Sequence, residues 1–166
     1  MITARGTARD GLVVGLIGYA AVALFYSGFD VLAARDPLYT VDLLGKAVFR
    51  GLRDPGVLLF PLPLDGTAIF LYNAFHLVLG IGIGLAVTAL AGEAERHPAR
   101  SPVVLLALIT GFVVTIAVVG LLTAPMRPVL PWWSIVVANA LAVIVAGAFL
   151  IRQRPLLWHR LTLVGG

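Results

Sequence analysis

The 166-residue chain is 60% hydrophobic and only 12% charged, with a mean hydropathy of +1.02, and these values exclude an ordinary soluble domain. It has no cysteine, which excludes disulfides, thiolate metal sites and cysteine nucleophiles. The net charge of +4 is typical of basic segments beside anionic lipid headgroups, so we expect the lipid bilayer as a partner and no nucleic acid.

Four apolar runs reach the roughly 20 residues that a helix needs to cross a bilayer. They cover residues 11–34, 67–91, 102–124 and 131–151. None of them alternates apolar and polar residues at every second position, as a membrane β-strand would. The sequence therefore predicts an all-α fold, a polytopic membrane four-helix bundle that forms a single domain over residues 1–166.

The first run follows Arg5 and Arg9 and continues past Phe29. A secretory signal has an apolar core of about 7 to 15 residues, so this run is too long to be one. We expect it to remain as the first span.

A different kind of helix is predicted between the first two runs. From Thr40, the stretch TVDLLGKAVFRGLRD separates apolar from charged residues at helical spacing. One face carries Val41, Leu44, Val48 and Leu52, and the other carries Asp42, Lys46, Arg50 and Arg53. This separation predicts an interfacial amphipathic helix over about 40–53 with its charged face among the headgroups, the alternative being a helix packed on a partner. Prolines then predict an extended apolar strip over 57–60.

The second run has one face of small and polar residues. Asn73 and His76 share a side of the helix with two glycines, at i, i+3, i+7 and i+11. Glycines four residues apart let another helix approach closely, and the first run repeats this spacing. The predicted packing residues are Gly11, Gly15, Gly80 and Gly84, and we expect some of these faces on the outside of the bundle.

Polar side chains from several runs fall at similar depth. At 1.5 Å per residue, His76 and Asn139 both lie roughly 12 to 14 Å below the starts of their helices. A polar side chain inside a membrane must point into the bundle, where a partner can satisfy it. The predicted buried polar cluster consists of Tyr26, Ser27, Asp30, Asn73, His76, Thr115 and Asn139.

His76 has three interpretations. We favour a hydrogen bond between helices; the imidazole could instead belong to a proton or ion pathway, or be an axial ligand of a haem or chlorophyll-type macrocycle. His97 and His159 lie outside the spans, so neither can oppose it. We therefore expect no cofactor, with a macrocycle at His76 as the alternative. Metal-binding, phosphate-binding and nucleophile motifs are missing from the sequence, so we expect no metal and no enzymatic activity.

Basic residues set the predicted orientation. With four spans, both termini and the 92–101 loop share one side of the membrane. The other side carries five basic residues, whereas this side carries seven: Arg5, Arg9, Arg96, Arg100, Arg152, Arg154 and Arg160. The sequence thus predicts a multi-pass protein of the bacterial inner membrane with both termini in the cytoplasm. Glu93 and Glu95 should lie in a solvated inner loop, and Trp132 and Trp133 at the outer interface.

The stretch YSGFDVLAARDPLYTVDLLGKAVF, residues 26–49, carries a pattern of seven residues: Asp30, Pro37, Leu38, Tyr39, Thr40, Leu44 and Gly45. This pattern resembles an uncharacterised group of small four-helix bacterial membrane proteins. The resemblance implies four helices plus an interfacial element, and it implies a recurrent histidine and asparagine at His76 and Asn139. It carries no established activity.

Three functional interpretations follow. The first is a non-catalytic accessory subunit of a larger membrane complex, respiratory or photosynthetic, in contact with other membrane subunits. The second is a small oligomeric transporter or channel, although the chain lacks the broken helices and repeated halves typical of transporters. The third is a haem- or pigment-binding protein that uses His76. We favour the first by elimination.

Overall fold

The computed structural model describes residues 4–52 and 63–154, and over these ranges it contains helices and no strand. The helices are α1 (Ala4–Leu32), α2 (Tyr39–Phe49), α3 (Gly66–Arg96), α4 (Ser101–Leu122) and α5 (Trp132–Gln153), with 3₁₀ turns at Pro98–Arg100 and Ala124–Met126. Four of them are long and apolar enough to cross a membrane. The predicted all-α bundle is confirmed, and the chain is a multi-pass membrane protein by this criterion.

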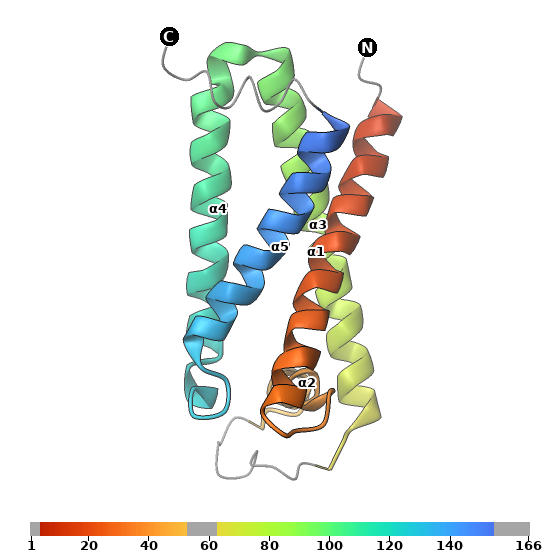
Figure 1. Ribbon diagram of the computed structural model, residues 1–166, viewed down its shortest axis with the longest axis vertical. Helices are drawn as coiled ribbons and strands as arrows, with labels where there is room; N and C mark the ends of the chain where they lie inside the picture. Colours follow the sequence, from red (N-terminus) through yellow and green to blue (C-terminus); the bar gives the residue numbers. More distant parts are fainter. Residues whose placement is uncertain (1–3, 53–62, 155–166) are drawn as a thin grey trace.

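The bundle has two ends, which differ in what they contain (Figure 1). At one, called here the α2 end, α1 stops, α3 starts, α2 lies across them, and α4 is joined to α5. At the other, called here the terminal end, α1 starts, α5 stops, and α3 is joined to α4. The predicted extended strip over 57–60 and the predicted charged residue Arg53 lie outside the described residues.

The central contact of the bundle is the crossing of α1 and α3, which is built on glycines. A Cβ added at Gly15 would lie 2.5 Å from the Gly80 carbonyl oxygen, and one added at Gly84 would lie 2.7 Å from the Gly15 Cα. A Cβ at Gly11 would lie 2.9 Å from the Leu85 Cα. Real Cβ contacts are longer, so these backbones meet only because the side chains are missing. The two glycine pairs face each other, and the expectation that such faces lie outside the bundle is wrong for them.

At the terminal end, a small apolar cluster joins the four long helices. It consists of Val14, Ala91, Ala94, Val104, Ala146 and Leu150. Next to the end of α5, the buried Arg154 guanidinium donates two hydrogen bonds to one oxygen of Asp10 on α1, at 2.9 and 3.2 Å, and one to Glu95 on α3, at 3.1 Å. One arginine therefore ties together three helices.

The solvated loop predicted for Glu93 and Glu95 is wrong, because α3 continues through both residues to Arg96. Glu95 accepts a hydrogen bond from Arg154, whereas Glu93 pairs with Arg96 at 3.2 Å and also accepts a hydrogen bond from Arg100. The carboxylates have basic partners close by, so the helix continues beyond the apolar run.

Helix α4 differs from the others because little of it is buried. Ser101 and Val104, in its first turns, are its only buried residues. The rest of its length presents large apolar side chains at the surface: Leu106, Ile109, Val113, Val114, Val118, Leu121 and Leu122. In Figure 1, α4 stands apart from α1 along most of its course. The described fold is therefore a packed group of α1, α2, α3 and α5 with α4 attached beside it.

The glycine crossing can be tested on α3 with a matched pair of substitutions. Gly84→Ala should lower the free energy of unfolding by about 1 to 3 kcal/mol, because the new methyl group overlaps the α1 backbone. Gly82→Ala is the control, since nothing lies within 4 Å of a Cβ at that position. Thermal unfolding in detergent would measure both. Equal stability of the two variants would contradict the observed crossing.

Candidate functional site

A cavity of about 120 Å³ lies between α1, α2 and α3 toward the α2 end. Its wall contains five residues of the predicted polar cluster: Tyr26, Ser27, Asp30, Asn73 and His76. It also contains Tyr72 and the first turns of α2. This cavity collects more of the predicted site residues than any other place in the described chain, so we treat it as the candidate site.

Asp30 is fully buried, and both of its carboxylate oxygens are occupied. One accepts the backbone N–H of Thr40 at 2.7 Å, and the other accepts the Thr40 hydroxyl at 2.7 Å. Thr40 lies in the first turn of α2, where N–H groups have no partner within the helix and a negative charge is stabilised by the helix dipole. Asp30 therefore supplies from α1 the cap that α2 does not provide for itself.

The backbone of Asp30 also ends α1. Its carbonyl accepts the N–H of Arg35 at 2.8 Å, while the N–H of Ala34 bonds to Val31 at 3.1 Å. This pair of bonds is a Schellman motif, which requires a left-handed residue, and Ala34 takes that conformation with φ of 56°. Arg35 then donates to the Val129 carbonyl at 3.0 Å and lies 4.8 Å from the centre of the Tyr39 ring. The corner thereby also holds the α4–α5 connection.

Two of the charged residues predicted on the outer face of α2 point into the protein, whereas a third, Arg50, has a 47% exposed side chain. Asp42 is 0% and Lys46 7% exposed, and their side chains pair at 2.7 Å. Asp42 accepts the Asp65 backbone N–H at 3.0 Å, and Lys46 donates to the Pro63 carbonyl. The prediction that charges of this face lie among headgroups is wrong for Asp42 and Lys46, because the pair neutralises itself and fixes the chain that enters α3. It is the apolar Val48 that is exposed.

Helix α2 is also seated directly on the start of α3. A Cβ at Gly45 would lie 2.5 Å from the Ala68 carbonyl oxygen, so only glycine permits this contact. Asp65 caps α3 by accepting the N–H groups of Thr67 and Ala68, both at 3.0 Å. The Arg50 side chain bonds to the same carboxyl group at 3.0 Å and, with these N–H groups, lowers the pKa of Asp65 from its ordinary value. Helix α2 itself ends at Phe49, short of residue 53, and the chain turns at residue 51.

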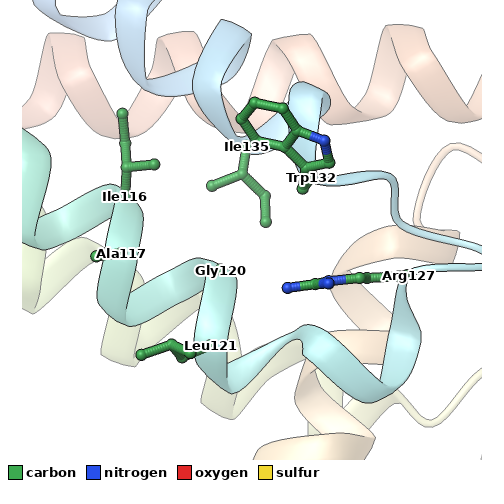
Figure 2. Close-up of a pocket in the computed structure, with 7 residues that line it drawn as sticks. All are labelled: Ile116, Ala117, Gly120, Leu121, Arg127, Trp132 and Ile135. Carbon is green, nitrogen blue, oxygen red and sulfur yellow. The ribbon is translucent and has the colours of Figure 1, made fainter.

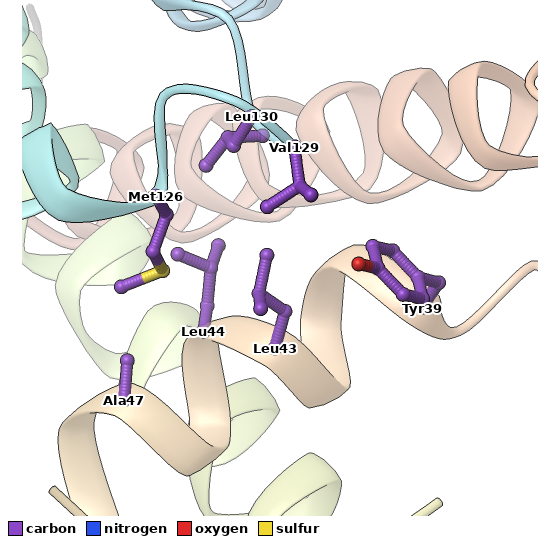
Figure 3. Packing of buried hydrophobic residues seen from close by; sticks show 7 residues of the cluster. All are labelled: Tyr39, Leu43, Leu44, Ala47, Met126, Val129 and Leu130. Carbon is purple, nitrogen blue, oxygen red and sulfur yellow. The ribbon is translucent and has the colours of Figure 1, made fainter. Parts of the chain in front are cut away.

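The inner face of α2 packs on the connection between α4 and α5, as Figure 3 shows. Leu43 and Leu44 lie against Met126, Val129 and Leu130, all of them buried. The α2 helix thus touches three parts of the chain: the end of α1, the start of α3, and the loop that begins α5. It is packed on its own chain, and its place in the headgroup plane stays a prediction.

His76 projects between two aromatic rings. Its ring centre lies 5.3 Å from that of Tyr19 on α1 and 5.9 Å from that of Tyr72 on α3. Within the described residues His76 has no hydrogen-bond partner, so the hydrogen bond between helices predicted for it is not found. Asn73 instead bonds across the helices, accepting the Tyr19 hydroxyl at 2.8 Å. Sequence reasoning missed Tyr19, although it lies four residues after Gly15.

Tyr26 lines the cavity and also reaches α5, with its hydroxyl 3.5 Å from that of Ser134. The last two members of the predicted cluster lie elsewhere. Asn139 donates to the Ile135 carbonyl of its own helix at 2.7 Å, and Thr115 donates to Gly111 of α4 at 2.8 Å. Neither lines the cavity. Including these two residues in one buried cluster is therefore wrong, because equal depth does not place side chains on facing sides of their helices.

The size and lining of the cavity limit its chemistry. A volume of 120 Å³ accommodates a few waters, and it is well below the roughly 300 Å³ at which pockets for drug-sized ligands begin. A porphyrin-type ring beside His76 would require the helices to separate, so this space does not fit that group. The described residues contain no group of three or more His, Asp or Glu side chains that could hold a metal ion.

No family model, curated protein or solved structure matches the chain. Membership in the group of small four-helix bacterial proteins stays a prediction. The structure does give physical roles to four residues of the pattern: Asp30 and Thr40 bond to each other, Tyr39 is buried beneath Arg35, and Gly45 meets Ala68.

The contacts of His76 predict how substitutions behave. His76→Ala should lower the free energy of unfolding by about 1 to 3 kcal/mol, through lost ring contacts with Tyr19 and Tyr72. His76→Phe should retain most of the stability, because it keeps a ring in that position, and His76→Gln should resemble the alanine variant. Thermal unfolding in detergent is the measurement. Rescue by glutamine and not by phenylalanine would show that a polar partner holds the imidazole.

Proposed function

We propose that the chain is a non-catalytic accessory subunit of a larger membrane complex, and that α4 is its main contact with other subunits. The observation that carries this proposal is the packing of α4, whose buried residues are confined to its first turns. A spanning helix that adds so little to its own bundle has its apolar length available for another protein. The bilayer is the other environment in which such a surface is stable.

The polar groups of the described chain support a structural role. Asp30 and Asp42 are the buried carboxylates of the described chain and Glu95 is nearly so, and each of the three is engaged with a helix terminus or a basic side chain. Their hydrogen bonds join helices to one another. Among the described residues that line the cavity, Ser27, Asp30 and His76 are not linked to each other by hydrogen bonds, since both Asp30 oxygens accept from Thr40. We accordingly propose that the protein contributes contacts and not chemistry.

The location follows the same proposal. The excess of basic residues on the side of the two termini supports an orientation with both termini in the cytoplasm of a bacterial cell. In that orientation the α2 end faces outward, and so do Trp132 and Trp133 at the start of α5.

Site-specific crosslinking in native membranes tests the α4 contact. A photoreactive residue at Val114, in the middle of α4 and 52% exposed, should form an adduct with one further polypeptide of defined mass. Native mass spectrometry should then find that same polypeptide at fixed stoichiometry with the 17.5 kDa chain. The matched control is Val78 on α3, also a valine within a span and 67% exposed.

Recovery of only the 17.5 kDa species, with lipid adducts alone from both positions, would contradict the proposal. A homo-oligomer that conducts ions in liposomes would replace it with the transporter interpretation.

A further inference from the structure

A groove of about 350 Å³ runs between α4 and α5 at the α2 end, separate from the cavity beside His76. Figure 2 shows its two sides: the last turns of α4, including Ile116 and Gly120, face Trp132 and Ile135 at the start of α5. The Arg127 side chain extends from the connecting loop across its mouth. The volume lies within the range of about 300 to 1,000 Å³ typical of ligand sites.

The groove changes from polar to apolar along its length. Arg127 lies just beyond the end of α4, at the level where a spanning helix meets the headgroups, and within the described residues its guanidinium has no ion-pair or hydrogen-bond partner. Trp132 beside it is 60% exposed and presents an indole at the same level. Ile116 lies six residues before the end of α4, about 9 Å deeper. A molecule that matches this gradient has an anionic head and an apolar tail.

We propose that this groove binds one anionic phospholipid, with its phosphate at Arg127 and one acyl chain between α4 and α5. A guanidinium is suited to phosphate because its N–H groups can bond two oxygens at once. A partner helix is too wide for the groove. A 9 Å length of helix about 10 Å across fills about 700 Å³, whereas the groove holds about 350 Å³. A single acyl chain needs no more than a narrow apolar slot.

Gly120 creates the space for the chain. It lines the groove, and nothing lies within 4 Å of a Cβ built on it. A larger side chain there can extend from an unobstructed Cβ into the groove. Gly111 lies on the same helix with equally open space at its Cβ and does not line the groove. These two glycines give a test in which the fold is unchanged.

The experiment is a titration of purified protein with phosphatidylglycerol and with phosphatidylcholine, followed by native mass spectrometry. Wild type should hold one phosphatidylglycerol. Gly120→Leu should weaken its binding about tenfold or more, and Gly111→Leu should leave it unchanged. Arg127→Gln should weaken phosphatidylglycerol about tenfold and remove its preference over phosphatidylcholine. Arg152→Gln, an exposed arginine at the terminal end, is the charge control.

Melting temperatures of the four variants confirm that each is folded. Glycerol phosphate, which has the head without the tail, should not compete. The proposal is overturned if Gly120→Leu and Gly111→Leu bind lipid equally, if glycerol phosphate displaces the lipid, or if a photoreactive residue at Leu121 captures a polypeptide in place of lipid. The first two outcomes do not depend on whether α4 also contacts another subunit.

Discussion

Asp30 is the residue on which the α2 end depends. Its backbone carbonyl closes the last turn of α1, and its carboxylate accepts hydrogen bonds from Thr40 in the first turn of α2, so one residue ends one helix and begins the next. A buried carboxylate without such partners would cost several kcal/mol in an apolar environment. The position of α2 is therefore coupled to satisfaction of this charge. From there, Gly45 fixes the start of α3, and Leu43 and Leu44 fix the loop that leads into α5.

The terminal end is organised by the same principle with the charges reversed. There a buried arginine at the end of α5 is satisfied by carboxylates from α1 and α3. Between the two ends, the helices meet where glycines allow contact of their backbones. Polar pairing at the ends and close packing in the middle hold α1, α3 and α5 together, and α4 is buried against them only in its first turns. This division between a self-contained group and an attached helix is the basis for assigning α4 a role in contacts.

The spans and the packing glycines could be predicted from the sequence, because apolar length and glycine spacing are local signals. The surroundings of α2 could not. Its charges and apolar residues separate cleanly, but Asp42 and Lys46 can neutralise each other at i, i+4, and a neutral pair can be buried as readily as exposed. The depth of Thr115 and Asn139 in the membrane follows from their position along each span. The rotation of each helix about its axis, which decides whether these side chains face the cavity, does not follow from the sequence. The tie between Arg154, Asp10 and Glu95 joins residues far apart in the chain, and their spacing carries no local signal.

The dependence on Asp30 is tested most directly by a double-mutant cycle with Thr40. Unfolding free energies in detergent would be measured for Asp30→Asn, Thr40→Val and the double variant. If the two side chains act as a unit, each single change should cost about 1 to 3 kcal/mol, and the double variant should cost little more than the larger single change. Costs that simply add would mean that the two residues stabilise the fold independently, and the corner at Asp30 would not have the organising role assigned to it.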